Sequence, residues 1–343
     1  MTARALLCAL LSCAGCRIEV GTPESRTPES RTPGSAGQQQ GGATVRIYSS
    51  MYKQVIDAAG PVLAAQLERT APGVQVEWYQ SGSEKIATRL DAELSTGTSP
   101  CDLLLTSDPT YYARLKRAGR LVPYVSPRAL RQPRAFVDPD GAWATSRLSV
   151  MVLAAAAAAH APTSFRALGE PGSRRVALGD PLSSGTSYTA VSTLVARYGW
   201  DYFRALKKNG AVVAGGNASV LQRLQTGESE SGWVLIENLL AARARGDRVQ
   251  LVVPSDGAVI VPGPIALLEH ARHSQAARAV YDALLSDEVQ RVLIEKGYLH
   301  SPDPALPPPP GAPSLTELLA HATPPSSEAP ESIKATFNAV FFP

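Results

Sequence analysis

Residues 175–198 read RVALGDPLSSGTSYTAVSTLVARY, and this stretch contains a strand pattern, a turn and a helix pattern in that order. The short run 175–178 ends at turn residues and is typical of a buried strand. The turn at 183–187 is rich in hydroxyl side chains, and apolar residues at helical spacing follow it over 188–198. A strand that feeds a helix through a short turn is the building unit of α/β folds.

The same order of strand and helix recurs along the chain. Nine short apolar or β-branched runs alternate with helix-length segments between residues 44 and 300. This alternation predicts an α/β fold with mixed, mostly parallel sheets. The runs are 44–48, 74–78, 102–105, 148–153, 175–178, 211–213, 232–235, 250–253 and 258–261.

Other turns between strand and helix also carry helix start signals. Ser81 and Glu84 have the spacing of a capping box, and Asp108 precedes Pro109 at the first position of a predicted helix. Asn217 stands before another helical pattern as a candidate N-cap. In α/β sheets such turns line the crevice where ligands bind, so we expect a binding site there.

Composition sets the scale of the molecule. The chain has 343 residues, of which 44% are hydrophobic and 18% charged, enough for two globular domains. Its 33 Lys and Arg and 30 Asp and Glu give a net charge of +3, and no segment concentrates the basic residues. Because binding to a phosphate backbone needs such a concentration, nucleic acid is not an expected partner.

The N-terminus has the layout of a secretory signal. A single Arg4 precedes the apolar run 5–11, which is much too short to span a membrane, and small residues then lead to Cys16. This ending resembles the lipobox of bacterial lipoproteins, so we expect residues 1–15 to be removed and Cys16 to carry a lipid. Cys13 is the alternative lipid site, and an ordinary signal without a lipid is the other alternative.

A spacer and a lone cysteine follow. Residues 16–43 are rich in Pro, Gly, Ser and Gln and repeat the five residues Thr-Pro-Glu-Ser-Arg, a composition that predicts a flexible tether. With Cys16 lipidated, Cys101 is the one thiol of the folded part, so no disulfide is expected within it. Its place beside the apolar run 103–105 predicts a buried small side chain.

The order of these segments resembles the bacterial extracellular solute-binding proteins of the iron(III)-type group, which deliver ligands to ABC transporters. The likeness spans roughly residues 44 to 305. It is carried by the segments 47–50, 80–84, 101–107, 179–186, 198–200, 227–228, 254–257, 284–290 and 297–298.

The resemblance implies a two-lobed periplasmic-binding-protein type II fold whose lobes close over a ligand by a hinge motion. Crossing strands between the lobes are expected near 143–150 and 260–266. The implied division places 44–146 and 264–300 in lobe 1, and 147–263 and 301–343 in lobe 2. We expect a monomer in the periplasm that works with the permease subunits of an ABC importer.

Helix N-termini that converge on one point could hold an anion without Lys or Arg, because their backbone N–H groups are unpaired and partly positive. Ser and Asn at these places also serve as plain helix caps, so the capping role remains an alternative. The resemblance places the following residues around the cleft: Ser49, Ser50, Ser81, Ser83, Thr106, Ser107, Ser184, Gly185, Thr186 and Asn217.

Two carboxylates are the expected charged groups of the cleft. Glu84 and Glu237 would suit an ammonium group or a divalent cation if both face inward. The capping box gives Glu84 another role, and Glu237 has the alternative of a solvated helix start. We therefore expect a small anionic or zwitterionic solute with a phosphonate, phosphate or carboxylate group.

Three other functions remain to be weighed. Ferric iron is the alternative cargo, but the stretch 233–240 lacks the tyrosine pair that commonly binds it in this group, and Tyr111 and Tyr112 are predicted to pack on a helix. A ligand-sensing subunit for a membrane receptor is a second alternative. Hydrolysis is not expected, because no histidine lies in the matched cleft segments and Gly-x-Ser-x-Gly is absent. No cofactor is expected.

Overall fold

The computed structural model describes residues 42–173, 175–272 and 274–343. The predicted signal peptide, Cys16, the alternative Cys13 and most of the predicted tether lie outside the described residues.

The first half of the sheet consists of three parallel strands, with β1 between β2 and β3. Helices follow β1, β2 and β3 in turn, as the strand-then-helix pattern predicts. The elements are β1 (Thr44–Ser49), α1 (Lys53–Thr70), β2 (Gln75–Gln80), α2 (Ser83–Ser95), β3 (Leu103–Leu105), α3 (Pro109–Arg117), β4 (Leu121–Val122), η1 (Ala129–Arg131) and η2 (Arg134–Phe136).

The second half repeats this arrangement. Here β6 lies between β7 and β8 and is parallel to both. The elements are α4 (Phe165–Leu168), β6 (Val176–Leu178), α5 (Gly185–Lys208), β7 (Val212–Val213), α6 (Asn217–Gln225), β8 (Ser231–Leu235), α7 (Ile236–Ala244) and β9 (Gln250–Val252).

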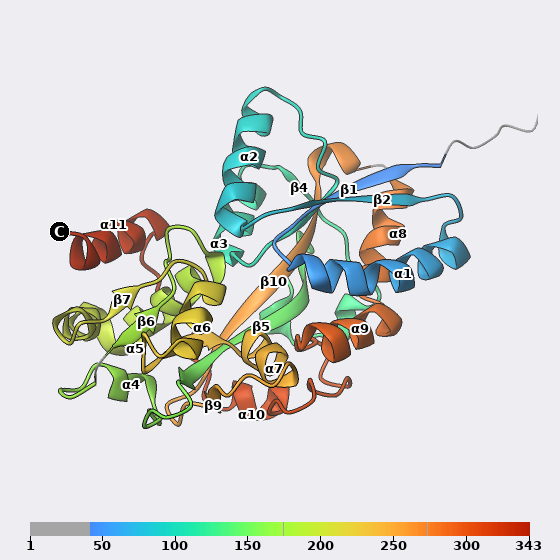
Figure 1. The fold of residues 1–343 in the computed structure, drawn as a ribbon. Coiled ribbons are helices and arrows are strands. Elements are labelled where there is room, and N and C mark those ends of the chain that lie inside the picture. The colour runs from blue at the N-terminus through green and yellow to red at the C-terminus, as the bar shows by residue number, and fades with distance from the viewer. Residues whose placement is uncertain (1–41, 174, 273) are drawn as a thin grey trace, which may run out of the picture. The chain divides into compact units, whose positions relative to one another are not determined.

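Two long antiparallel strands join the halves. β5 (Ala144–Ala155) and β10 (Val259–Leu268) pair along most of their length, with a register shift between Gly263 and Pro264. The strand order is β2-β1-β3-β10-β5-β8-β6-β7, and Figure 1 shows β5 and β10 running between the group around β1 and the group around β6. The predicted α/β class is confirmed. The sheet is mixed because every ladder of β5 and β10 is antiparallel.

The remaining helices follow β10. η3 (Glu269–Ala271), α8 (Gln275–Leu284) and α9 (Asp287–Gly297) return to the first half, where α8 and α9 pack against α1. A proline-rich connector then leads to α10 (Leu315–Leu319) and α11 (Pro330–Phe341).

The apolar core divides in the same way as the sheet. Two clusters draw their buried side chains from residues 45–144 and 265–299. Two others draw theirs from residues 150–261 together with the C-terminal helices. Each half thus has its own core, and β5 and β10 contribute to both.

Of the three helix caps named from the sequence, Asp108 is confirmed and the other two are wrong. The side chains of Asp108 and Ser184 accept hydrogen bonds from the first turns of α3 and α5. The capping box of Ser81 and Glu84 does not form, because Gly82 is the N-cap of α2 and Glu84 is then one position too early. Asn217 is likewise not a cap, since α6 is capped by Gly216.

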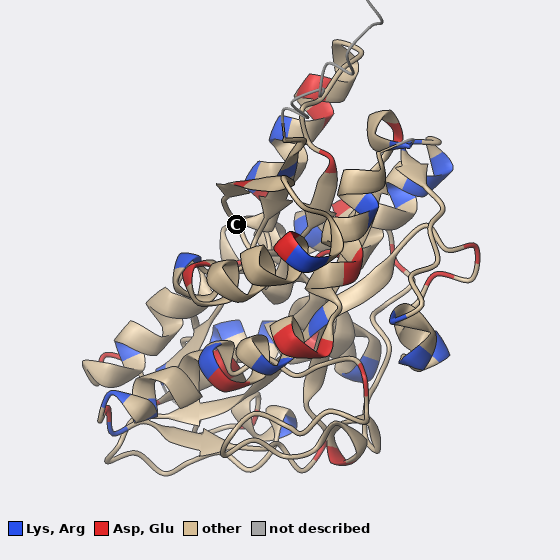
Figure 2. Cartoon of the chain, turned by 90° about the vertical axis from the view of Figure 1, so that its right-hand side faces the viewer, with Lys and Arg blue, Asp and Glu red and all other residues tan. Residues whose placement is uncertain are grey.

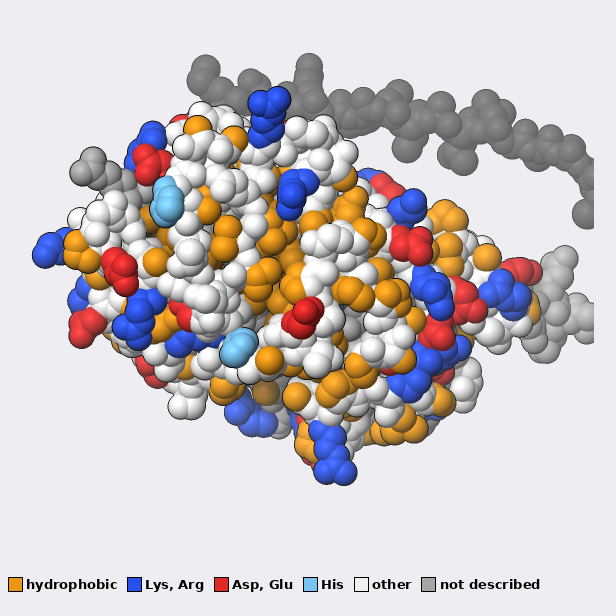
Figure 3. All heavy atoms as spheres, turned by 90° about the horizontal axis from the view of Figure 1, so that it is seen from below, with side chains coloured by type: hydrophobic (Ala, Val, Ile, Leu, Met, Phe, Trp, Pro, Cys, Tyr) orange, Lys and Arg blue, Asp and Glu red, His pale blue; other side chains and the backbone are white. Residues whose placement is uncertain are grey.

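Charged side chains are spread over the surface with both signs mixed. Figure 2 shows Lys and Arg beside Asp and Glu on the same helices, and Figure 3 shows charges toward two sides of the lower face with mainly apolar and uncharged groups between them. Among the described residues, no helix is both long and apolar enough to cross a membrane.

Candidate functional site

A cavity of about 230 Å³ lies between the two halves of the sheet. Five helices begin at it, and each follows the carboxyl end of a parallel strand: α1 after β1, α2 after β2, α5 after β6, α6 after β7 and α7 after β8. Carboxyl ends of parallel strands meet at one edge of a sheet, which is why sequence-distant turns gather here. Backbone N–H groups at these helix starts make the wall electropositive.

Eight of the twelve residues predicted for the site line this cavity. They come from both halves of the molecule and include seven residues with small polar side chains or none, together with one carboxylate. The eight are Ser50, Ser83, Ser107, Ser184, Gly185, Thr186, Asn217 and Glu237.

The other four predicted residues are not part of the lining. The Ser49 hydroxyl accepts a hydrogen bond from the backbone N–H of Met51, and the Thr106 hydroxyl lies 3.4 Å from the Tyr112 hydroxyl. Ser81 donates its backbone N–H to the carbonyl of Ser49. Glu84 is turned away toward the C-terminal helix. Ser49, Ser81 and Thr106 thus bond within the strand ends next to the lining, whereas Glu84 bonds to Lys334 of the C-terminal helix.

A buried arginine that the sequence analysis did not propose completes the site. Arg147 lies on β5 and is only 3% exposed. Its guanidinium donates hydrogen bonds to the hydroxyls of Ser50 at 3.2 Å and Ser107 at 3.1 Å. The prediction from the sequence considered helix N-termini alone, and the lining of this cavity adds a buried guanidinium to them. A single charge inside the apolar run 144–155 was the available signal.

Arg147 has no carboxylate within ion-pair distance among the described residues. Burial lowers the pKa of its guanidinium to about 10, and the charges of Tyr112 and Glu237 partly oppose that shift. The group remains protonated at neutral pH. The cavity therefore has one fixed positive charge whose bonds within the protein are to neutral hydroxyl groups.

Glu237 faces the same cavity from the first turn of α7 and is 5% exposed. Burial raises the pKa of its carboxyl group to about 7, against smaller opposing effects of the Ser149 hydroxyl, nearby backbone groups and Arg147. Its Oε2 atom has no hydrogen-bond partner among the described residues. A buried acceptor of this kind is costly unless a ligand or water donates to it.

Asn217 adds a second unpaired acceptor. Its Nδ2 donates to the Thr186 hydroxyl at 2.8 Å, and that hydroxyl lies 3.0 Å from the hydroxyl of Ser184. These contacts fix the amide, while the buried Oδ1 of Asn217 has no partner within the described part of the chain. The cavity thus offers donors around Arg147 and acceptors at Asn217 and Glu237.

The two halves touch across the cavity. The Tyr52 hydroxyl donates to Oδ1 of Asn238 at 3.3 Å, which links the start of α1 to α7. Gly185 at the start of α5 packs directly on Ser83 at the start of α2. The described conformation is therefore a closed one.

Neither a metal cluster nor a reactive thiol is found in the described part of the chain. No group of three or more His, Cys, Asp or Glu there could hold a metal ion. Tyr111 and Tyr112 are both buried in the core and bond to different partners, as the packing prediction requires. Cys101 is buried and free, and burial raises the pKa of its thiol well above the usual range.

Two lobes joined by crossing strands, with a closed cavity between them, define a binding protein of the periplasmic type II class. The sequence model described as bacterial extracellular solute-binding protein matches residues 45–299. The chain belongs to this family.

Known relatives and structures agree with this assignment. The chain is 26% identical over 239 residues to the phosphoglycerate transport regulatory protein PgtC of Salmonella typhimurium, a match that covers 66% of this chain and 59% of the relative. The iron-bound HitA of Pseudomonas aeruginosa superposes with a TM-score of 0.72 at 18% identity, over 87% of this chain and 99% of that one. The periplasmic binding protein AfuA of Actinobacillus pleuropneumoniae, with fructose-6-phosphate bound, gives 0.70 at 21% identity, over 87% and 96%.

Proposed function

We propose that this protein captures a small anionic or zwitterionic solute between its lobes and delivers it to an ABC importer. The observation that carries the proposal is Arg147, a buried cation in the wall of the cavity whose hydrogen bonds go to neutral hydroxyls. Burying an unpaired charge costs several kcal/mol even after relaxation. An anion placed against Arg147 and the surrounding helix starts would offset that cost.

On the opposite side of the cavity, unpaired acceptors need hydrogen-bond donors from a ligand. Oδ1 of Asn217 and Oε2 of Glu237 are both buried acceptors without a partner among the described residues. A hydroxyl or ammonium group on the solute would satisfy both. The volume of about 230 Å³ lies below the roughly 300–1,000 Å³ of pockets for drug-sized ligands, so the solute is small.

Phosphate esters that also carry hydroxyl groups fit both sides best. A phosphate would sit against Arg147 and the helix N-termini, and its hydroxyl groups would reach the two acceptors. Two similar proteins support this class of solute, since the name of PgtC concerns phosphoglycerate transport and AfuA has fructose-6-phosphate bound. Phosphonates and carboxylates remain within the proposed class.

Ferric iron is the less supported cargo, although HitA is iron-bound. Fe³⁺ prefers several anionic oxygen donors. The ionisable side chains of the lining are Tyr52, Arg147 and Glu237, which offer one carboxylate and one phenol beside a fixed positive charge. Burial also raises the pKa of Tyr52 to about 12, so that phenol is reluctant to ionise.

Sensing is a second candidate function, because the name of PgtC describes a transport regulatory protein. The same closed form could be presented to a membrane receptor instead of a permease. Chemical crosslinking in cells, followed by identification of the captured membrane partner, separates the two functions. Capture of a permease supports import, and capture of a receptor supports sensing.

We further propose that the protein acts in the periplasm as a lipid-anchored monomer without enzymatic activity. The signal-like residues 1–15, a lipid on Cys16 with Cys13 as the alternative, and the tether 16–43 support the anchor. Separate cores support the division into lobes of 44–146 with 264–300 and of 147–263 with 301–343, which would close about β5 and β10.

The proposal is tested by thermal shift against inorganic phosphate, phosphonates, 3-phosphoglycerate, fructose 6-phosphate, simple carboxylates and ferric citrate. A true ligand at a hundredfold excess over its Kd adds about 2.7 kcal/mol to the unfolding free energy. We expect stabilisation by at least one phosphate ester. Stabilisation by ferric citrate alone would contradict the proposal.

Matched arginine variants show whether the cavity is responsible. Arg147→Met should abolish the ligand-dependent shift. Arg243→Met changes an exposed arginine at the end of α7 and should leave the shift intact. A full shift in Arg147→Met would remove the observation on which the proposed function depends.

A further inference from the structure

The C-terminal extension, residues 300–343, lies beyond the segment 45–299 that matches the family. It leaves α9 as an irregular proline-rich connector and ends in α11. This extension contacts both halves of the molecule, so it connects the two lobes.

The extension is fixed to the second half by apolar packing. Ile333, Phe337 and Phe341 on one face of α11 are buried in the core beside α5. The backbone N–H of Ser326 donates to both the carbonyl and the hydroxyl of Ser192 on α5, each at 3.1 Å. Any motion of the second half therefore carries α11 with it.

At the rim of the cleft, α11 is bonded to the first half. Nζ of Lys334 lies 2.7 Å from Oε2 of Glu84 on α2, and both side chains are largely shielded, with 26% and 22% exposure. The ammonium also lies 5.5 Å from the centre of the Tyr188 ring on α5. Glu84 follows Ser83, which lines the cavity, so this ion pair crosses the cleft next to the binding site.

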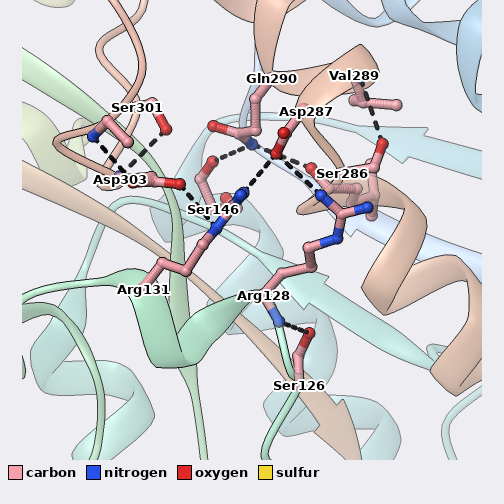
Figure 4. Close-up of polar contacts among 12 residues, drawn as sticks. Ser126, Arg128, Arg131, Ser146, Ser286, Asp287, Val289, Gln290, Ser301 and Asp303 are labelled. Atoms are coloured by element: carbon pink, nitrogen blue, oxygen red, sulfur yellow. Dashed lines mark hydrogen bonds and ion pairs between the residues drawn. The ribbon is translucent and has the colours of Figure 1, made fainter.

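A second connection lies at the base of the extension. Nε of Arg131 is 2.8 Å from Oδ2 of Asp303, and Arg131 also pairs with Asp287 at the start of α9. Arg128 bonds to the same Asp287 at 2.9 Å. Figure 4 shows Arg131 between the two carboxylates, so the connector is held against the first half where it leaves α9.

We propose that the C-terminal extension is a strap that restrains opening of the cleft, with the Lys334–Glu84 ion pair as its releasable end. Its base stays near the crossing strands, where a hinge motion is small, and its far end spans the rim, where the motion is large. Opening must therefore break Lys334–Glu84. Since a partly shielded pair of this kind contributes modestly, we expect about a fivefold effect on the ratio of closed to open forms.

Hydrogen exchange of the full chain without added solute tests the strap. In Lys334→Met, peptides covering the N-terminal turns of α2 and α5 should exchange about fivefold faster, because these turns are covered in the closed form. Peptides from the centre of β5 should be unchanged. Lys208→Met is the matched control, since Lys208 is an exposed lysine at the end of α5 and should behave as the wild type.

Exchanging the two charges of the Lys334–Glu84 ion pair distinguishes the loss of this specific contact from a general loss of packing. Glu84→Lys with Lys334→Glu should restore slow exchange at the cleft, whereas each single reversal should accelerate it. Unchanged exchange in Lys334→Met, or no rescue in the double variant, would overturn the strap. So would faster exchange throughout both lobes with a lower melting temperature. None of these results depends on which solute binds.

Discussion

A Cβ atom at Gly185 would lie 3.0 Å from both Cβ and Oγ of Ser83. Gly185 opens α5 in the second lobe, and Ser83 opens α2 in the first, so the two helix starts meet with no room for a methyl group. The backbone of Gly185 needs no left-handed conformation. Glycine is required here because the lobes approach closely, in addition to any approach of a ligand.

Gly185→Ala should therefore hinder closure while leaving each lobe folded. The added Cβ would also lie 3.2 Å from the carbonyl of Ser107, and backbone atoms yield little. We expect solute affinity to fall at least tenfold, with a change in melting temperature of a few degrees at most. Isothermal titration with the solute found by thermal shift measures the affinity.

The matched control is Gly60→Ala. Gly60 lies inside α1, and nothing would stand within 4 Å of its added Cβ. Alanine in a helix interior is more stable than glycine by roughly 0.5–1 kcal/mol, so this variant should be slightly stabilised and bind normally. If Gly185→Ala bound the solute with normal affinity, the closed lobes would have room for a methyl group between Gly185 and Ser83, and this prediction would be wrong.

Gly263→Ala should displace Arg147, the proposed anion-binding group, because the added methyl group would crowd its guanidinium. Gly263 pairs with Arg147 across β10 and β5, and its Cβ would lie 2.8 Å from Nη1 and 2.9 Å from Cζ of that arginine. The guanidinium would have to move off Ser50 and Ser107. We expect a loss of solute affinity of tenfold or more and a stability cost of about 1–3 kcal/mol.

Titration and denaturation together check this prediction. Arg147→Met supplies the limit of complete loss of binding, so the double variant is compared by denaturation. Because the guanidinium that Gly263 faces is absent there, Gly263→Ala should cost less stability in Arg147→Met than in the wild type. Additive losses in the double variant would mean that Gly263 acts independently of the arginine.

Glu237 should make stability depend on pH. Its pKa is raised from 4.5 to about 7, so the folded protein holds a proton that the unfolded chain releases between those values. The unfolding free energy therefore falls as pH rises through this window, by up to about 3 kcal/mol, and levels off above it. Arg147 and Tyr52 are the charged or ionisable side chains coupled to it.

Glu237→Gln should remove this contribution. Urea unfolding at pH 5 and pH 8 measures the unfolding free energy of both proteins. Between these two pH values, this free energy should fall less in the variant than in the wild type. The other titrating groups are the same in both proteins, so their effects cancel in the comparison. Equal declines in both proteins would mean that the carboxyl group already ionises normally in the folded state.

Thr186→Val should weaken binding through Asn217. Valine keeps the shape of threonine but cannot accept the 2.8 Å hydrogen bond from Asn217 Nδ2, so the amide loses its orientation. Leaving a buried donor unpaired costs about 1–3 kcal/mol of stability. We expect solute affinity to fall as well, because the Oδ1 atom of Asn217 is no longer held in place toward the cavity. Thr316→Val, at an exposed position of α10, is the control. An unchanged Kd in Thr186→Val would separate Asn217 from solute recognition.

Local patterns were sufficient for the fold class, and the family resemblance for much of the site. Alternating strand and helix periods predicted α/β architecture, and the cap at Asp108 could be read from the proline that follows it. Most of the eight lining residues were placed by the resemblance to the solute-binding family. The shared direction of parallel strands explains why turns so far apart in the sequence meet at one edge.

Contacts between distant segments required the tertiary structure. Arg147 reaches Ser50 and Ser107, which are 97 and 40 residues away, and Lys334 meets Glu84 across 250 residues. The predicted strand 148–153 begins one residue after Arg147, and the sequence does not show which side chains face that arginine. Those partners depend on how two separately packed lobes close against each other, and no local pattern of side chains encodes that relative placement.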